Sequence, residues 1–509
     1  MPKPNILHLF TDQQRFDTIA ALGNGVIRTP NLDRLCREGV AFTNAYTPSP
    51  VCISARCSMI TGQYPMRTGC YANTPMPIGR QTFMDALTQV GYRTHGIGKC
   101  HFSPDRYALR GFQSREHQEE SPSQRDLEEP TYYRYLHEKG LTFANEVMGV
   151  RGEMYYVPQK SAMPAAEHPT QWIGDRAVAF LEEAPGERPW YLFASFIHPH
   201  PPFAPPDPWH KLYRTTLMPL PKVPPDNEAL LTFINRVQNR YKYRDQGMDR
   251  HLVRAMKAYY YACISFVDYQ VGRILEALER TGQLDNTLIL YASDHGEHLG
   301  DYNCFGKRSC HDTAARVPMI FRGPGPFTGG TVCDDIVSLV DVAPTFLNAA
   351  GADITEHPLD GLDLADVLAG TTDREIVFAQ FAYEDRSAPD FVSTPETVAA
   401  GSSTMAVSTR WKYFYSAPDN REFLFDRLAD PGETRNQAYV TAFRSEACTM
   451  MRSALMEHLK ACGTTAGIDG DNWRVFPQRE IPPDPDAGLL IQDTFTPWAK
   501  MDFPPGYQF

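Results

Sequence analysis

The chain has 509 residues, of which 42% are hydrophobic and 22% charged, enough for one large domain and a smaller one. Lys and Arg number 49 against 61 Asp and Glu, so the formal net charge is −12. Such a charge repels nucleic acids and anionic membranes, so we expect no partner of either kind. An anionic ligand would need cations placed locally around it.

Strand and helix signals alternate through the first half of the chain and beyond. Short apolar runs bounded by polar residues predict strands at 5–10, 94–97, 190–197 and 287–292. Apolar residues at helical spacing predict helices at 31–39, 82–90, 175–183 and 253–280. This alternation is typical of an α/β fold with a large, mainly parallel sheet sandwiched by helices.

The pattern changes near residue 376. Short strands are predicted at 375–381, 405–408, 413–416 and 423–425, followed by a helix at 442–461. We therefore predict a large domain at 1–375, a smaller antiparallel α+β domain at 376–470 and an extended tail at 471–509. The tail is rich in prolines and aromatic residues, so we expect it to lie along a neighbouring surface, either of this chain or of another subunit. We therefore expect a homodimer or homotetramer.

Two stretches, 103–171 and 199–227, are predicted to be long loops that form the rim of an active site. The first contains tyrosines that could stack on an aryl or sugar ring or surround a quaternary ammonium group. They could equally well pack the loop against the protein. These tyrosines are Tyr107, Tyr132, Tyr133, Tyr135, Tyr155 and Tyr156.

The eleven cysteines are scattered from Cys36 to Cys462, with no Cys-x-x-Cys pair and no zinc-site spacing. The N-terminal stretch MPKPNILHLF becomes polar too soon for a signal peptide, and the sequence has no apolar run of about 18 residues. These features predict a cytoplasmic protein in a reducing compartment.

Acidic side chains follow two of the predicted strands. Asp12 comes just after the strand at 5–10, and Asp294 and His295 come just after the strand at 287–292. Ligands of open α/β sheets lie outside the carboxyl ends of strands. Two carboxylates and a histidine there suit a divalent cation such as calcium, magnesium or manganese, although each aspartate could instead cap a helix.

The stretch PSPVCISARCSMITG, residues 48–62, places Cys52 at the start of a predicted helix that closes at Gly62. Arg56 lies four residues further on, on the same helical face. A helix N-terminus lowers the pKa of a thiol and favours anions. From the residues alone, Cys52 is either such an activated thiol or a buried structural cysteine beside a surface arginine.

The same stretch resembles the sulfatase signature Cys-x-Pro-Ser-Arg-x-x-x-x-Thr-Gly, and further segments extend the resemblance over nearly the whole chain. These segments are TDQQRFD, TPNLDRLCREGVAFTNAY, GIGKCHF, SFIHPHPPF, SDHGEHLGD, GKRSCHDTAARVPMIF, SLVDVAPTFLNAAG, LDGLDL and FLFDRLADPGETRN. By this resemblance the chain is identified as a member of the sulfatase and phosphonate monoester hydrolase branch of the alkaline phosphatase superfamily. That implies an alkaline phosphatase-like fold.

In this family a maturation enzyme oxidises the cysteine to formylglycine, so the resemblance implies that Cys52 is the precursor of the nucleophile. The hydrated aldehyde attacks sulfur or phosphorus, and the free aldehyde is regenerated when sulfate or phosphate leaves. A serine could not release the product in this way. Arg56 is implied to hold the oxygens of the hydrate and to offset their charge.

The resemblance also implies the other site residues. The ligands of one divalent metal ion, calcium or manganese with magnesium as a further candidate, would be Asp12, Gln13, residue 52, Asp294 and His295. The residues that contact the transferred group and the leaving oxygen would be Lys99, His101, His200 and Lys307. Of these, His200 or Lys307 would protonate the leaving group. The neighbours His198 and Arg308 are the alternatives to His200 and Lys307.

Two departures from the family pattern bear on function. Gln13 stands where most sulfatases carry a second aspartate, which is closer to phosphonate monoester hydrolases and choline-sulfatase-like members. Ser54 and Ala55 stand where the maturation signal usually has Pro and Ser, so the sequence leaves open whether Cys52 is converted.

The first hypothesis for function is hydrolysis of a small anionic sulfate ester. The alternative is hydrolysis of a phosphonate monoester or phosphodiester by the same residues, because all three substrates carry one negative charge. A phosphate monoester, with about two charges, is less suited. A non-catalytic binding protein is the third hypothesis, although Asp12, Arg56, Asp294, His295 and Lys307 are all present.

Overall fold

The computed structural model describes residues 3–120, 122–141, 147–151, 155–183, 188–243, 249–372, 374–383, 392–440 and 446–481. Its large sheet has eight strands in the order β4-β3-β5-β1-β6-β7-β2-β8. The strands are β1 Asn5–Asp12, β2 Val40–Tyr46, β3 Arg93–Gly98, β4 Ser114–His117, β5 Trp190–Pro199, β6 Thr287–Ser293, β7 Met319–Arg322 and β8 Thr331–Ser338. Neighbours run parallel except at β7, which is antiparallel to both β6 and β2, so the predicted mainly parallel sheet is confirmed.

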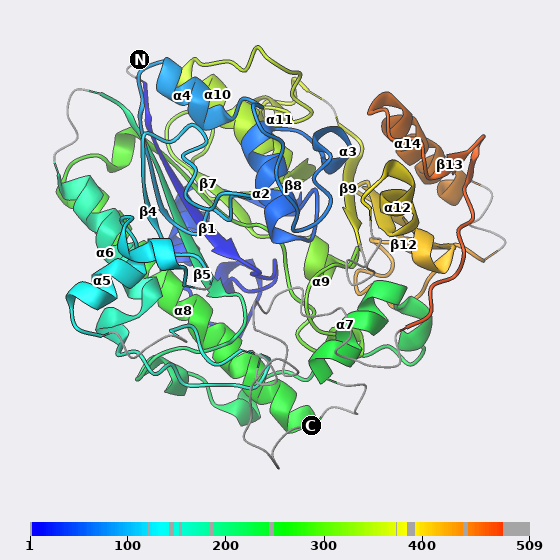
Figure 1. Cartoon of the computed structure of the whole chain (residues 1–509), viewed down its shortest axis with the longest axis horizontal. Coiled ribbons are helices and arrows are strands. Elements are labelled where there is room, and N and C mark those ends of the chain that lie inside the picture. Colours follow the sequence, from blue (N-terminus) through cyan, green and yellow to red (C-terminus); the bar gives the residue numbers. More distant parts are fainter. Residues whose placement is uncertain are drawn as a thin grey trace.

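Helices cover both faces of this sheet (Figure 1). The longer ones are α1 Pro30–Glu38, α2 Cys52–Thr61, α4 Phe83–Gln89, α5 Tyr132–Glu138, α6 Pro169–Glu182, α7 Phe233–Tyr243, α8 Arg250–Arg280 and α10 Val342–Ala350. Along β1, Ile6 and Phe10 pack with α2, α4 and α10, whereas Leu7 and Leu9 pack with α1, α6 and α8. Side chains of a strand alternate between faces, so a strand that is covered twice is mostly apolar along its length. In β1 the polar His8 interrupts the apolar residues, and it is buried with its Nδ1 3.1 Å from the hydroxyl of Tyr191.

A second sheet is antiparallel, in the order β12-β11-β10-β9. It comprises β9 Val377–Ala382, β10 Ser402–Val407, β11 Trp411–Ser416 and β12 Arg421–Asp426, and α14 Ala447–Ala461 packs on it. The predicted small α+β unit is therefore present, while the boundaries predicted at 375 and 470 stay predictions. The predicted helical residues 442–445 and most of the tail, 482–509, lie outside the described residues.

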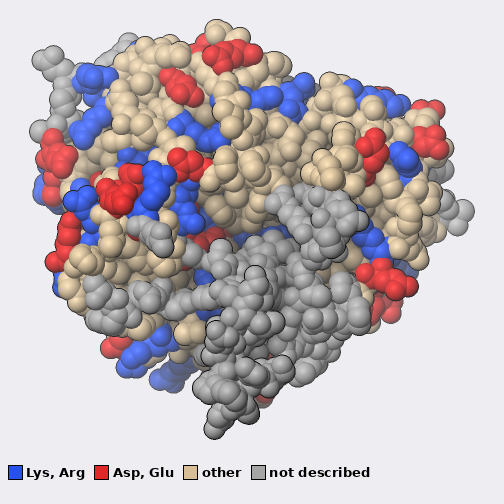
Figure 2. Space-filling view, in the orientation of Figure 1, with Lys and Arg blue, Asp and Glu red and all other residues tan. Residues whose placement is uncertain are grey.

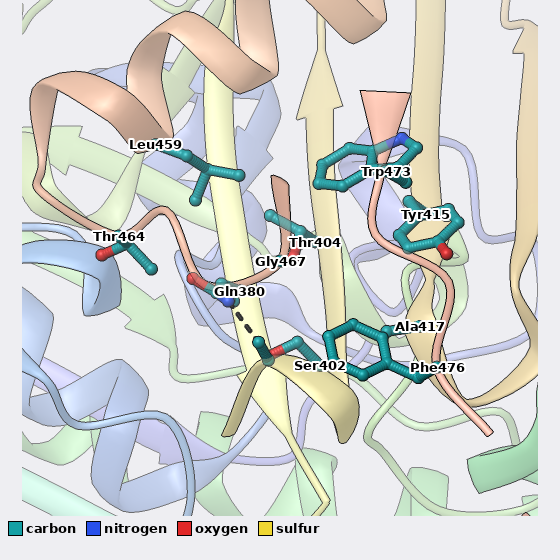
Figure 3. Close-up of a pocket in the computed structure, with 11 residues that line it drawn as sticks. Gln380, Ser402, Thr404, Tyr415, Ala417, Leu459, Thr464, Gly467, Trp473 and Phe476 are labelled. Carbon is teal, nitrogen blue, oxygen red and sulfur yellow. Dashed lines mark hydrogen bonds between the residues drawn. The ribbon is translucent and has the colours of Figure 1, made fainter. Parts of the chain in front are cut away.

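Residues just after α14 fold back on the small sheet. The ring of Trp473 stacks on that of Tyr415, with centroids 4.5 Å apart, and Gln380 donates a hydrogen bond to Ser402 at 3.0 Å (Figure 3). These four side chains line a cavity of about 20 Å³. About 10–15 Å³ is enough for one water molecule, so the cavity has room for about one water and none for an organic ligand, and we interpret it as a packing gap.

The two predicted loops differ in outcome. Residues 199–227 contain only short 3-10 turns, as expected, whereas residues 103–171 contain β4, α5 and the start of α6. In the described ranges, no helix is both long and apolar enough to cross a bilayer. On the face in Figure 2, basic and acidic side chains are interspersed over the described surface.

Candidate active site

Asp12, Asp294 and His295 meet at the carboxyl ends of the neighbouring strands β1 and β6. The Nε2 atom of His295 lies 3.8 Å from Asp12 Oδ1 and 3.5 Å from Asp294 Oδ1. Together with Cys52, their ligand atoms all lie within 4.8 Å of one another, and all four residues are buried. Asp12 ends β1, Asp294 follows β6, and the next described helical turns begin several residues later, so the alternative that they cap helices is wrong. Burial and the charge of Asp12 raise the pKa of Asp294 to about 6.

Gln13 has a left-handed backbone, with φ of 67°. Its main-chain N–H donates to Asp294 Oδ1 at 3.0 Å, and its side-chain Nε2 donates to Glu297 and, at 3.4 Å, to Tyr156. The Oε1 atom is buried without a hydrogen-bond partner among the described residues. Two carboxylates and an imidazole, together with the orphaned amide oxygen of a residue whose main chain contacts Asp294, make an oxygen-rich donor set that fits a hard divalent cation.

Cys52 begins α2, as predicted, and only 1% of the residue is exposed. Its Sγ lies 3.2 Å from His295 Nε2 and 3.7 Å from Asp12 Oδ1, and it accepts a hydrogen bond from Lys307 Nζ at 2.7 Å. Burial and the charge of Asp12 raise the pKa of Cys52 to about 12. Of the two interpretations left open by the residues, a buried cysteine therefore fits better than a thiol activated by the helix N-terminus, because burial outweighs the helix terminus.

Arg56 is buried rather than on the surface. Its Nε donates to Asp294 Oδ2 at 3.0 Å and its Nη2 to Asp12 Oδ2 at 3.4 Å. Its Nη1 donates to the carbonyl oxygen of Lys99 at 2.7 Å and to Ser195 Oγ at 3.1 Å. The guanidinium group of Arg56 thus links the carboxyl ends of β1 and β6 to the end of β3 and to β5. It also offsets the negative charge of two buried carboxylates.

The other predicted residues surround the same point. Lys99 Nζ lies 2.6 Å from Asp12 Oδ2. A ring nitrogen of His101 lies within 4.8 Å of Cys52 Sγ. The Nδ1 atom of His200 lies 2.7 Å from the carbonyl oxygen of Pro201, and its Nε2 lies 3.5 Å from the hydroxyl of Tyr155. The structure therefore brings together every residue predicted for the site, while their roles stay predictions.

The structure also separates the two pairs of neighbours. His198 faces away from the site, because its Nδ1 contacts Thr170 Oγ1 at 3.1 Å and its ring stacks on His168, with centroids 4.9 Å apart. Lys307 Nζ donates a hydrogen bond to Cys52 Sγ at 2.7 Å, whereas the main-chain N–H of Arg308 donates to the carbonyl oxygen of Pro50 at 3.1 Å. The Arg308 guanidinium still interacts electrostatically with Cys52, Tyr155 and Tyr156, so it belongs to the surroundings of the site. The geometry favours His200 and Lys307.

Sequence reasoning missed two glutamates of the site. Glu297 accepts hydrogen bonds from the side-chain amide of Gln13 and, at 2.8 Å, from the hydroxyl of Tyr156. Its place two residues after His295 was a usable signal. Glu120 forms an ion pair with Lys99 and lies 3.7 Å from His200 Nε2. Glu120 sits in a charged stretch without any distinctive spacing, so nothing in the sequence points to it.

The predicted rim tyrosines divide into two groups. Tyr155 and Tyr156 reach the site through His200 and Glu297. The other four pack within the protein: Tyr132 and Tyr135 lie against Trp172, Tyr133 lies against Tyr132, and the hydroxyl of Tyr107 donates to Asp126 at 2.7 Å.

Comparison with known proteins gives consistent matches. The sulfatase family model matches residues 4–352, and a model described as N-sulphoglucosamine sulphohydrolase, C-terminal, matches residues 300–461. Choline-sulfatase of Rhizobium meliloti is 32% identical, over 87% of this chain and 86% of the relative. Arylsulfatase of Clostridium perfringens is 28% identical, over 90% and 95%. Among solved structures, phosphonate monoester hydrolase of Agrobacterium radiobacter has a TM-score of 0.76 at 26% identity, over 91% of this chain and 96% of that chain.

Proposed function

This chain belongs to the sulfatase family and is a sulfuric ester hydrolase, and from that premise we propose that Cys52, converted to formylglycine, supplies its nucleophile. One observation carries the proposal: the ligand atoms of Asp12, Cys52, Asp294 and His295 lie within 4.8 Å of one another in a buried cluster. A thiol is a poor partner for a hard cation among oxygen donors, and conversion of Cys52 to an oxygen-bearing residue removes this mismatch.

The metal is proposed to be calcium or manganese, with magnesium as a further candidate, held by Asp12, Gln13, residue 52, Asp294 and His295. A bound divalent cation polarises the transferred group and offsets its charge. Formylglycine supplies a hydrated aldehyde as the nucleophile.

The chain's own cations then bind the ester. Lys307 Nζ, 2.7 Å from Cys52 Sγ, is placed to stabilise negative charge on residue 52. Lys99 Nζ, 2.6 Å from Asp12 Oδ2, and His101, with a ring nitrogen within 4.8 Å of Cys52 Sγ, are placed to hold the oxygens of the transferred group. These contacts supply the local positive charge that a protein of net charge −12 needs to bind an anion.

His200 and Lys307 are the two candidates for the leaving-group proton. Because Nδ1 of His200 faces the carbonyl oxygen of Pro201, its hydrogen lies on Nδ1 and Nε2 is an acceptor in the neutral ring. Burial lowers the pKa of His200 well below its usual value, which favours the neutral form. We therefore assign the proton donation to Lys307 and an orienting hydrogen bond to His200.

Conversion of Cys52 can be tested directly. Mass spectrometry of the tryptic peptide from Glu38 to Arg56, in protein from the native host, is expected to show the mass of formylglycine. Unmodified cysteine throughout would contradict the proposal. Ser54, which departs from the usual signal, lies in the first turn of α2, where its hydroxyl donates to the carbonyl oxygen of Cys70, so it has a separate role in the folded helix.

Activity gives the second test. Cys52→Ala is expected to abolish hydrolysis of 4-nitrophenyl sulfate. Cys57→Ala, a change of another buried cysteine of the same helix, is the matched control and should stay within about threefold of the unchanged protein. Equal activity of the two variants would contradict the assignment of the nucleophile.

Hydrolysis of phosphonate monoesters or phosphodiesters is the second candidate. Gln13 at the second acidic position and the likeness to phosphonate monoester hydrolase support it. The ratio of kcat/KM for 4-nitrophenyl sulfate and 4-nitrophenyl phenylphosphonate separates the two functions. A sulfate preference above about tenfold, which is about 1.4 kcal/mol of transition-state stabilisation, supports the first, and the reverse preference supports the second.

We also propose a formylglycine-generating enzyme as a partner in maturation, a homodimer or homotetramer in solution, and a cytoplasmic location. The cysteines are scattered along the sequence without any Cys-x-x-Cys pair, which supports a reducing compartment. Light scattering coupled to size-exclusion chromatography tests the oligomeric state, and a monomer would contradict it.

A further inference from the structure

Glu120 lies inside the group of side chains that surround the predicted place of the transferred group. One carboxylate oxygen forms an ion pair with Lys99 and lies 3.7 Å from His200 Nε2. A Glu120 oxygen is also within 4.8 Å of the Sγ of Cys52 and of a ring nitrogen of His101. The acidic side chain is therefore a neighbour of the same groups that would bind the ester.

Two cations fix this carboxylate. Besides the ion pair of one oxygen with Lys99, the other oxygen lies 3.2 Å from an Nη atom of Arg151. The Glu120 side chain is only 16% exposed, so solvent screens its charge weakly. Lys99 is shared with Asp12 at 2.6 Å, so its ammonium already lies between the two carboxylates. Side chains of the protein itself therefore hold the Glu120 carboxylate in place.

A fixed negative charge beside the binding position acts differently on different substrates. Coulomb repulsion grows in proportion to the charge of the incoming group. A sulfate ester, a phosphodiester and a phosphonate monoester each carry one negative charge, whereas a phosphate monoester carries about two near neutral pH. The repulsion from Glu120 therefore weighs most heavily on the phosphate monoester.

We propose that Glu120 is a specificity-determining residue that favours singly charged transferred groups and disfavours doubly charged ones. The inference rests on the proposed function of the site. By this inference Glu120 disfavours phosphate monoesters. The cations of the site cannot do so, because they attract a doubly charged group more strongly than a singly charged one.

The experiment compares three esters with the same leaving group at pH 8: 4-nitrophenyl sulfate, 4-nitrophenyl phenylphosphonate and 4-nitrophenyl phosphate. In Glu120→Gln, which keeps the shape of the side chain, kcat/KM for the phosphate should rise at least about tenfold relative to the other two. The ratio between the two singly charged esters should stay within about threefold. The inhibition constant of phenyl phosphate against sulfate hydrolysis should fall by about tenfold.

Two further variants control for structural effects. Glu120→Asp keeps the charge and should keep the original selectivity, whereas Glu120→Ala should shift it in the same direction as Glu120→Gln. Glu116→Gln is the matched control. Glu116 lies four residues before Glu120 on the same chain segment, but it forms an ion pair with Arg176, away from Cys52 and its neighbours. It should change none of the ratios.

The opposite results would overturn the inference. A uniform fall of kcat/KM for all three esters in Glu120→Gln would mean that Glu120 only positions Lys99. Unchanged ratios together with an unchanged inhibition constant would mean that its charge is not felt by the substrate. Failure of the unchanged protein to hydrolyse the sulfate above the Cys52→Ala background would instead refute the proposed function.

Discussion

Replacing Glu297 by glutamine is expected to weaken binding of the divalent cation by about 30- to 140-fold. Glu297 is fully buried and accepts four hydrogen bonds with its two oxygens. One oxygen accepts from the amide of Gln13 and, at 2.8 Å, from Tyr156. The other accepts from the main-chain N–H groups of Leu299 at 3.0 Å and Gly306 at 2.5 Å.

The magnitude follows from counting acceptors. A glutamine keeps one oxygen, which can satisfy two of the four donors, and its amide group would face Gln13 as a donor against a donor. Two lost hydrogen bonds at about 1–1.5 kcal/mol each give about 2–3 kcal/mol, and 1.4 kcal/mol corresponds to a tenfold change in affinity. The simplest relief is a flip of Gln13, which turns its orphaned oxygen away from the cation.

Isothermal titration calorimetry of calcium or manganese into chelator-treated protein measures the effect. Glu422→Gln is the matched control, because Glu422 also accepts from a tyrosine hydroxyl, that of Tyr413 at 2.7 Å, but in the small sheet. The control should keep the dissociation constant of the unchanged protein. A dissociation constant within about twofold of the original in Glu297→Gln would refute the role of Glu297 in orienting Gln13.

Three further predictions concern stability. Lys412→Met leaves the buried carboxylates of Asp312 and Glu433 without their shared cation, so the free energy of unfolding should fall by about 3–5 kcal/mol; an unchanged melting temperature in circular dichroism would contradict this. Burial lowers the pKa of His458 to about 4, so the folded state binds its proton less tightly than the unfolded state, and stability should fall as the pH drops from about 6.5 towards 4. His458→Phe should make urea midpoints at pH 7.5 and pH 5 more alike, and an equal difference in both proteins would count against this cause. Removal of the metal ion by a chelator should lower the melting temperature of the unchanged protein, since a ligand at 100 times its dissociation constant stabilises the folded state by about 2.7 kcal/mol. The melting temperature of Asp294→Asn, which lacks one of the proposed metal ligands, should change little or not at all on chelation.

The central strands were predictable because they are buried on both faces. β6 is an apolar run bounded by polar residues, and β1 and β5 are apolar runs interrupted inside by His8 and Ser195; each was predicted within a few residues. β8 is different, because it lies at the edge of the sheet and half of its residues are exposed, so its sequence TVCDDIVS has no apolar run. β7 has only four residues, too few for a period to show.

Some features of the candidate site were likewise predictable from the sequence, and others were not. Asp12 and Asp294 were predictable because a parallel sheet brings the carboxyl ends of its strands together. The direction of the Cys52 pKa was not, because it depends on how deeply α2 is buried and on the charge of Asp12, neither of which is visible in local sequence. Glu120 reaches the site from the chain beyond β4, and only the three-dimensional path of that segment reveals it.

The depth at which Cys52 lies has a consequence for the timing of maturation. With 1% of the residue exposed at the buried start of α2, no enzyme can close its active site around Cys52 in the folded protein. The proposed oxidation must therefore take place on the growing or newly released chain, before α2 docks on the sheet. Chains that fold first keep their thiol permanently. The active fraction of a preparation is then decided during synthesis, and adding the oxidising enzyme to purified, folded protein will not increase it.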